Sequence, residues 1–385
     1  MQCAVCKGRG WCGLPRCPVL SRFRAQVSVS PSEQYAGCAP SVFVGSRGYP
    51  RPRSGPLMST DADQPPEWIA QELDIEQIIA IRARTIRGTI SAQTYLSSLQ
   101  EIALSSQPLE VEVAFERPPR FDLIFDGTVT PIGLSGSIRR LQVVDHPRVD
   151  RVVDRVTTDT DLGAAQGCTI LREANIDVYR ISQLLTSGLL GRRRRLVPTR
   201  WAITATDDMV FSGLRPRLLR AHSLDHIQLF STTLYGNTII CLLVPGDWSF
   251  EMIEIWGKHS LWGGENDIIL EDGERQKRTA YSSISGAYYA ARLAVAEHLT
   301  GIHRTARVLV VRSVSQEYWA PLGTWVIREV TRKALQENPM TFDNIDIAAG
   351  AISSLLGSTN WIRHSHLLPR LKSQWVLSDF PGVQP

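Results

Sequence analysis

The stretch Gly286-Ala-Tyr-Tyr-Ala-Ala-Arg-Leu-Ala-Val-Ala-Glu-His-Leu299, followed by Ala306-Arg-Val-Leu-Val-Val311, decides the fold class. In the first run Tyr289, Leu293 and Ala296 fall on one helical face, whereas the second run is β-branched and apolar, as in a buried strand. A further helix is expected over 325–335. Because helices and strands alternate along the chain, the sequence predicts an α/β or α+β body rather than a helical bundle or a β-sandwich.

Patterns on either side of this stretch predict further elements. Apolar periodicity predicts a helix or a pair of helices between residues 66 and 88 and single helices over 91–104 and 176–185. Alternation or β-branched runs predict strands over 109–115, 121–125, 200–206, 226–233 and 238–244. Residues 208–220, interrupted by Gly213 and Pro216, are expected to be helical or irregular.

The composition is that of an ordinary globular protein of 385 residues, with 43% hydrophobic and 21% charged residues. Lys and Arg number 42 against 38 Asp and Glu, so the net charge of +4 permits a nucleic-acid partner without requiring one. The longest apolar run, Ile239–Val244, is far too short to cross a bilayer, and the N-terminus lacks the apolar segment of a secretory signal. A cytoplasmic protein without a membrane partner is therefore expected.

Composition also divides the chain into four parts. Residues 1–20 are rich in cysteine, glycine and arginine and are expected to form a small metal-binding module, and residues 21–66 an extended connector rich in Pro, Gly, Ser and Arg. The α/β body is assigned to 67–362, and a flexible tail to 363–385.

Four of the seven cysteines, Cys3, Cys6, Cys12 and Cys17, lie within fifteen residues, among glycines that permit tight turns. Four thiolates in tetrahedral arrangement are a preferred ligand set for structural Zn²⁺, so these residues predict one zinc site and a zinc-knuckle module. Three alternatives stay open: a disulfide pair, an iron–sulfur cluster, or surface thiols without a metal.

Three motifs resemble a known family. They are Cys3-Ala-Val-Cys-Lys-Gly-Arg-Gly-Trp-Cys-Gly-Leu-Pro-Arg-Cys-Pro18, Pro40-Ser-Val-Phe-Val-Gly-Ser-Arg-Gly-Tyr-Pro50 with Gly55-Pro-Leu57, and Val197-Pro-Thr-Arg-Trp-Ala-Ile-Thr-Ala-Thr-Asp-Asp208. They are similar to motifs of the archaeal Nre (NreA/NreB) DNA-repair family, and the likeness runs along essentially the whole chain. The resemblance implies a cytoplasmic protein that contributes to the repair of DNA damage and, in many members, docks on the sliding clamp PCNA. It implies no established reaction.

The C-terminal segment carries a candidate PCNA-binding motif. Gln374, Leu377 and Phe380 follow the pattern Gln-x-x-aliphatic-x-x-aromatic, and a 3₁₀ turn would place these three side chains together as a one-sided plug. Pro381 stands where such motifs usually carry a second aromatic residue, which predicts weak binding. The alternative is a tail that folds back on the body through Trp375 and Phe380.

Two acidic clusters are candidates for catalysis with a second divalent metal: Asp207 and Asp208, expected after a strand, and Glu251 and Glu254. The spacing of the second pair places both carboxylates on one face of a helix but on opposite faces of a strand. The alternative is that Asp207 and Asp208 cap the following segment and that both glutamates are solvated.

Arg192, Arg193, Arg194 and Arg195 form the densest run of charge and are candidates for contacts with DNA phosphates, with a solvated basic loop as the alternative. The leading functional hypothesis is therefore a DNA-repair factor that binds DNA non-specifically and is recruited to PCNA. Two others remain: a metal-dependent hydrolase or nuclease acting on nucleic acid or nucleotides, and a scaffold without DNA contact. Whether the chain is an enzyme is left open.

Overall fold

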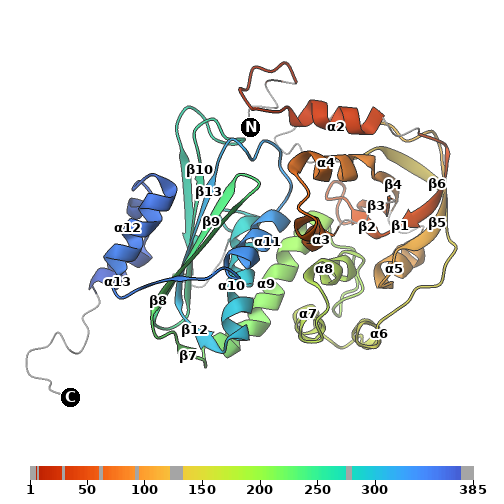
Figure 1. Cartoon of the computed structure of the whole chain (residues 1–385). Helices are drawn as coiled ribbons and strands as arrows, with labels where there is room; N and C mark the ends of the chain where they lie inside the picture. The colour runs from red at the N-terminus through yellow and green to blue at the C-terminus, as the bar shows by residue number, and fades with distance from the viewer. Residues whose placement is uncertain are drawn as a thin grey trace, which may run out of the picture. The chain divides into compact units, whose positions relative to one another are not determined.

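The structure is a computed structural model, and it describes residues 6, 8–27, 31–59, 64–91, 95–121, 133–274 and 280–373. The chain divides into two compact units, Met1–Pro216 with Trp319–Val326 and Arg217–Tyr318 with Ile327–Pro385. Each unit is built on a six-stranded mixed sheet with helices, so the predicted mixed α/β class is confirmed (Figure 1). In the described part of the chain no helix is both long and apolar enough to span a bilayer.

The sheet of the first unit has the strand order β1-β5-β6-β4-β3-β2, and only β4 and β6 run parallel. Its strands are β1 (Gln34–Ala39), β2 (Ser41–Val44), β3 (Arg53–Met58), β4 (Ile86–Ser91), β5 (Leu109–Phe115) and β6 (Ser135–Val143). The strand predicted over 109–115 is confirmed. Its alternate residues Leu109, Val111, Val113 and Phe115 are buried, because successive side chains of a strand point to opposite faces.

Strands β1, β2 and β3 lie in the segment that the sequence assigned to an extended connector. Their backbone is extended as expected, but its amides and carbonyls are hydrogen-bonded into the sheet. Gly55 of β3 crosses Gly88 of β4 so closely that a Cβ at position 55 would lie 1.9 Å from the Gly88 carbonyl oxygen. The sheet therefore requires a residue without a side chain at this point of the Gly55-Pro-Leu57 motif.

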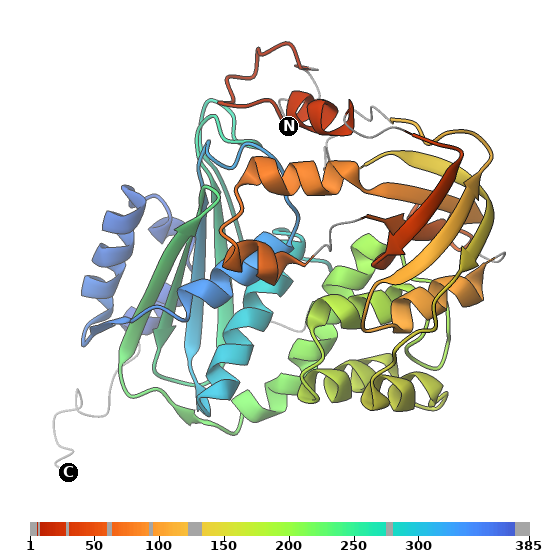
Figure 2. The same ribbon diagram turned by 45° about the vertical axis from the view of Figure 1, so that its right-hand side comes forward.

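The first unit has helices in the segments where the sequence predicted them, between residues 66 and 88 and near 91–104 and 176–185. Helices over 18–27, 151–158 and 164–173 were not predicted, and the first of them extends into the segment assigned to an extended connector. One further helix is an exception, because it contradicts a predicted strand. The helices of this unit are α2 (Pro18–Val27), α3 (Pro65–Ala70), α4 (Ile75–Arg84), α5 (Leu96–Leu104), α6 (Arg151–Thr158), α7 (Ala164–Glu173), α8 (Val178–Thr186) and α9 (Thr199–Leu218). Helix α4 begins with a capping box, in which Asp74 and Gln77 satisfy each other's backbone amides. Helix α2 packs along α4, as Figure 2 shows.

The exception is α9, because the strand predicted over 200–206 is wrong. The buried residues Ala202, Thr206 and Val210 recur every four positions, so they lie on one face of a long helix that starts directly after Pro198. A short β-branched window resembles a strand, but the same pattern extended through Val210 has the helical period. Tertiary packing of that face outweighs the local β propensity.

The second unit has the strand order β11-β10-β13-β9-β8-β14, with β10 and β13 parallel and the other pairs antiparallel. Its strands are β8 (Ile227–Leu234), β9 (Asn237–Val244), β10 (Ser249–Trp256), β11 (Ile268–Gly273), β13 (Arg307–Val314) and β14 (Met340–Phe342), beside a small pair of β7 (His222–Ser223) and β12 (Arg304–Thr305). The helices are α10 (Gly286–Gly301), α11 (Trp325–Ala334, which begins in the first unit), α12 (Ile345–Leu356), the 3₁₀ turn η1 (Ile362–His364) and α13 (Leu367–Ser373). The strands predicted near 226–233, 238–244 and 306–311 and the helices near 286–299 and 325–335 are confirmed.

Helices cover both faces of this second sheet (Figure 1). On one face Ile240, Leu242, Ile253 and Val311 pack in an apolar cluster that includes residues of α12, Trp361 and α13. On the other face Phe250 of β10 meets Tyr288 of α10, with ring centroids 5.2 Å apart. A strand of this sheet is therefore buried on both sides, which explains why β9 and β13 are almost continuously apolar.

The tail prediction is wrong for residues 363–373. The 3₁₀ turn η1 and helix α13 occupy this segment, and Leu367 and Leu368 are buried in the apolar cluster of the second sheet. The last twelve residues, 374–385, lie outside the described part of the chain, as do most of the residues of the strand predicted over 121–125.

Candidate functional site

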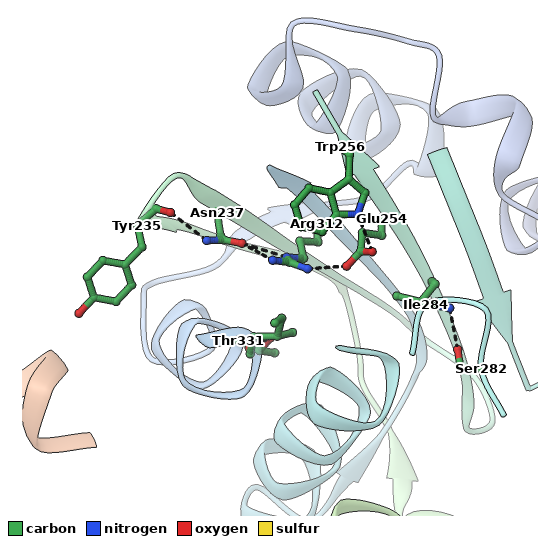
Figure 3. Close-up of polar contacts among 9 residues, drawn as sticks. Tyr235, Asn237, Glu254, Trp256, Ser282, Ile284, Arg312 and Thr331 are labelled. Atoms are coloured by element: carbon green, nitrogen blue, oxygen red, sulfur yellow. Dashed lines mark hydrogen bonds and ion pairs between the residues drawn. The ribbon is translucent and has the colours of Figure 1, made fainter. Parts of the chain in front are cut away.

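A charged network is buried inside the second unit (Figure 3). Arg312 of β13 donates from Nη1 to Glu254 Oε1 at 2.5 Å, and from Nε and Nη2 to Asn237 Oδ1 at 3.0 and 2.6 Å. Trp256 donates its indole N–H to the other oxygen of Glu254 at 2.9 Å. Asn237, Glu254 and Arg312 are each at most 4% exposed. Because each charge has a partner of opposite sign and further hydrogen bonds, the network tolerates burial.

The strand register creates this contact. Glu254 and Arg312 are directly opposed in the parallel pair of β10 and β13, so their side chains leave the sheet on the same face. Asn237 reaches the pair because it follows the tight turn at Tyr235 and Gly236, both of which have positive φ. A Cβ at Gly236 would lie 2.4 Å from the backbone nitrogen of Tyr318, so the turn also requires glycine for space.

Glu251 has a different task on the opposite face of β10. Its carboxylate accepts hydrogen bonds from Ser365 Oγ at 2.8 Å and from the backbone amides of His366 and Leu367 at 2.7 and 3.0 Å. These amides belong to the start of α13, where a negative charge also complements the helix dipole. Glu251 therefore fixes the C-terminal helix to the sheet.

The predicted acidic clusters do not assemble as the sequence suggested. Glu251 and Glu254 lie on opposite faces of a strand, and the prediction that both are candidates for one cation is not supported by their hydrogen bonds to α13 and to Arg312. Asp207 and Asp208 do not follow a strand but lie within α9, with Asp207 buried. Among the described residues, no group of three or more His, Cys, Asp or Glu side chains could hold a metal ion.

The N-terminal segment brings two of the four predicted zinc ligands together, namely Cys6 and Cys12. Burial would raise the pKa of the Cys6 thiol, yet hydrogen bonds from the backbone of Cys12, Trp11 and Gly10 and from the Cys12 side chain leave this pKa below its ordinary value. Burial, followed by the contact with Cys6, raises the pKa of the Cys12 thiol. The arrangement therefore makes Cys6 the more acidic of the two thiols, with the Cys12 thiol as a hydrogen-bond partner beside it.

Of the other two predicted ligands, Cys17 is among the described residues. Cys17 comes directly before α2, and a Cβ at Gly8 would contact Val19 and Leu20 of that helix, so the turn after Cys6 folds back toward the start of α2. Cys3 lies outside the described residues. In contrast, burial raises the pKa of both Cys168 and Cys241 to about 12, which marks them as inert core thiols.

The arginine run lies in the loop between α8 and α9, not between a helix and a strand. Arg194 donates from its guanidinium to the carbonyl oxygens of Thr157, Leu189 and Asp159, and so fastens the loop to the end of α6. Arg192 donates to the Asp161 carbonyl at 2.7 Å yet stays exposed, and Arg193 and Arg195 are also exposed. The run therefore contains two residues that are bonded to the rest of the unit, Arg194 and Arg192, and three exposed residues, of which Arg192 is one.

Sequence reasoning missed Arg312 and Asn237 as partners of Glu254. A signal was present, because Arg312 is a charge inside the largely apolar run 307–314 and Glu254 is a charge inside the largely apolar run 249–256. Two buried strands with opposite charges predict a pair, but only if the strands are known to be neighbours.

Comparison with known proteins places these features in a family. Two family models, described as "Archaeal Nre, N-terminal" and "Archaeal Nre, C-terminal", match residues 11–263 and 273–380. The chain belongs to the archaeal Nre family. It is 33% identical to the DNA repair protein NreB of Archaeoglobus fulgidus, over 96% of this chain and 97% of that protein.

Two further Nre relatives carry similar names. The DNA repair protein NreA of Archaeoglobus fulgidus is 33% identical over 94% of this chain and 95% of its own length. The DNA repair protein NreA of Haloferax volcanii is 33% identical over 81% of this chain and 80% of its own length. No solved structure matches this Nre chain.

The buried pair generates a stability prediction. Replacing Arg312 by alanine leaves the Glu254 carboxylate buried without its cation, which should lower the free energy of unfolding of the second unit by roughly 3–5 kcal/mol. The double variant Arg312→Met/Glu254→Leu removes both charges, so its free energy of unfolding should fall much less. Urea unfolding measures both values, with Arg304→Ala as control, because the Arg304–Asp225 pair is exposed and should contribute less than about 1 kcal/mol. Equal losses for the single and double variants would contradict the argument.

Proposed function

We propose that this Nre chain is a DNA-repair factor that binds DNA non-specifically and is recruited to PCNA by its C-terminal segment. The observation that carries the proposal is the 33% identity, over nearly the full length of both chains, to relatives named DNA repair proteins. Three local features support its parts: an anchored basic loop, a cysteine segment, and a C-terminal motif that follows a fixed helix.

The basic loop is suited to contacts with phosphates. Arg194 holds the loop in place, so Arg192, Arg193 and Arg195 can present their guanidinium groups to solvent with little loss of backbone entropy on binding. The carboxylate of Asp159, whose carbonyl oxygen accepts from Arg194, is partly engaged, because its Oδ1 accepts from the amides of Asp161 and Leu162. Contacts of this kind bind DNA of any sequence.

The cysteine segment is suited to one structural Zn²⁺. Cys3, Cys6, Cys12 and Cys17 would hold the ion, and the amides directed at Cys6 would stabilise its thiolate. The segment is tied to the first unit, where Arg16 pairs with Glu76 of α4 at 2.5 Å and α2 packs along α4. A metal here would therefore stabilise an N-terminal module, and no step of a reaction is assigned to it.

The candidate PCNA motif, Gln374, Leu377 and Phe380, lies outside the described residues but follows α13 directly. Glu251 and the buried Leu367 and Leu368 hold α13 on the second sheet. A motif that follows a fixed helix at a chain end can reach a partner surface without unfolding of the body.

The DNA prediction concerns the exposed arginines. Arg193→Glu/Arg195→Glu should weaken binding about equally for all DNA sequences, and should flatten the slope of log affinity against log salt by ~0.9 per lost phosphate contact on duplex DNA. Anisotropy titrations of labelled duplexes at several salt concentrations measure both quantities. The control is Lys258→Glu/Arg363→Glu, because these exposed residues change the net charge equally. A similar loss in the control would mean that net charge, not the loop, governs binding.

The metal prediction concerns the zinc content of the protein and the cysteines that hold the zinc. Elemental analysis of the purified protein should find about one zinc per chain, and Cys6→Ser/Cys12→Ser should lose it, since soft thiolate ligands are removed. Cys38→Ser serves as control, because Cys38 lies in β1 outside the cluster. Iron in place of zinc would support a cluster, and no bound metal in the wild type would refute the site.

The clamp prediction concerns residues 374–385. Truncation after Ser373 keeps α13 and removes the motif, so it should abolish binding to the cognate PCNA while leaving thermal stability unchanged. Without a second aromatic residue the wild-type affinity is expected to be micromolar, or ~−8 kcal/mol. Calorimetry checks this, with Leu377→Ala/Phe380→Ala as the point variant. Undiminished binding of the truncated chain would show that the motif match is a coincidence.

A further inference from the structure

Two sequence motifs that lie 150 residues apart meet in the first unit, namely the segment around Tyr49 and the segment around Trp201. The Val44 amide at the end of β2 donates to Thr199 Oγ1 at 3.0 Å, and the Val42 amide donates to Gln183 Oε1 at 3.2 Å. Strand β2 is at the edge of its sheet, and these two bonds give its outward-facing amides acceptors from Gln183 of α8 and Thr199, the first residue of α9. The loop after β2 is thereby held beside the N-terminal turn of α9.

That loop has a defined conformation. Gly48 has a φ of +79°, the Arg51 amide donates to the Gly48 carbonyl at 2.9 Å, and the Gly45 amide donates to the Arg53 carbonyl at 2.8 Å. The turn carries Tyr49 outward, where its ring meets the indole of Trp201 edge-on, with centroids 5.2 Å apart and an interplanar angle of 62°.

Both rings of this pair are accessible, since Tyr49 is 44% and Trp201 is 46% exposed. Other ring pairs differ, because Tyr281 rests on the buried Tyr289 and Tyr288 on the buried Phe250. Two large aromatic side chains that hold each other in place yet stay half exposed form a small adjoining aromatic surface that a ligand can contact. The pair is already ordered, so a ligand need not immobilise it.

The two chain segments that carry the pair are rich in arginine. Residues 40–59 and 187–206 contain eight arginines and no Asp or Glu. Arg194 is hydrogen-bonded to the end of α6, and Arg53, although exposed, is hydrogen-bonded to Thr89 and Ser137. The other six are exposed: Arg47, Arg51, Arg192, Arg193, Arg195 and Arg200. Aromatic rings on segments that also carry exposed guanidinium groups fit a ligand that has both flat π surfaces and negative charges.

We propose that Tyr49 and Trp201 form a platform on which unpaired bases of single-stranded DNA stack, while the neighbouring exposed arginines contact its phosphates. The inference rests on the proposed DNA-binding function and deepens it. In a duplex the bases are already stacked on one another, so an aromatic ring adds affinity only for a strand whose bases are free. The same arginines serve both forms of DNA, because phosphates are common to both.

The test compares single-stranded and duplex DNA on the full-length protein. Anisotropy titrations use a labelled 20-nucleotide oligothymidine and a 20-base-pair duplex, with Trp201→Ala, Tyr49→Ala and Trp201→Phe. Each alanine variant should bind the single strand roughly 5- to 100-fold more weakly and the duplex as tightly as the wild type, since stacking is lost but phosphate contacts remain. Trp201→Phe keeps an aromatic face and should restore most of the affinity for the single strand.

Tyr281→Ala is the matched control, because it removes an exposed aromatic ring from the second unit and should alter neither affinity. Circular dichroism confirms folding, and Trp201→Leu replaces Trp201→Ala if the smaller residue destabilises α9.

The outcomes separate the two levels of the proposal. If the alanine variants bind the oligothymidine as the wild type does, while Arg193→Glu/Arg195→Glu loses both DNAs, the platform is refuted and the basic loop stands. Equal losses for duplex and single strand would also overturn stacking. A wild type that binds neither DNA would remove the DNA-binding function itself.

Discussion

The ion pair between Arg312 and Glu254 is the contact on which the second unit depends. It joins the one parallel pair of strands in the described sheet of this unit, β10 and β13, at the centre of a layer covered by helices on both faces. The guanidinium lies 5.0 Å from the ring centroid of Trp256 and 5.8 Å from that of Tyr318. These aromatic rings therefore contact the charge in addition to the oxygens of Glu254 and Asn237. Strands of apolar side chains could pair in several registers, but a buried charge is satisfied in only one, which makes the pair a device for specificity.

Strand β10 carries a second buried carboxylate on its other face, and this residue connects the core to the chain end. Glu251 accepts hydrogen bonds from the start of α13. The helix that precedes the candidate PCNA motif is therefore fixed by β10, the strand whose Glu254 binds Arg312. Carboxylates that the sequence suggested as metal ligands thus serve as an ion-pair partner and a helix anchor. Both tasks use the same property, a buried negative charge that must be matched by donors.

Arginines divide into two classes in this protein, and position rather than residue type separates them. Arg194 and Arg53 donate to protein oxygens and set the shape of a loop and of a strand edge, whereas their neighbours Arg193, Arg195 and Arg51 are exposed. The anchored residues make the exposed ones useful, since guanidinium groups on a fixed backbone lose less entropy when they bind phosphate. The proposed platform of Tyr49 and Trp201 depends on the same arrangement.

The sequence by itself determined the mixed α/β class, most of the elements with a strong period, the spacing of the cysteines and the family. Such features depend on side chains that are near one another along the chain, where periodicity reports burial directly. Helix α9 was not predicted, because residues 200–206 favour a strand until the buried face formed with Val210 is included. The order and structure of residues 363–373 were not predicted either, because they depend on Glu251, more than a hundred residues away.

Only the tertiary structure decided which charge meets which. Glu254 and Arg312 are 58 residues apart, Glu251 and Ser365 are 114 apart, and Tyr49 and Trp201 belong to motifs separated by most of the first unit. Contacts of this range follow from strand order and register, which place distant residues opposite each other and which no local pattern encodes. The sequence therefore names the residues that carry charge and aromatic surface, and the fold assigns each of them a partner or leaves it exposed.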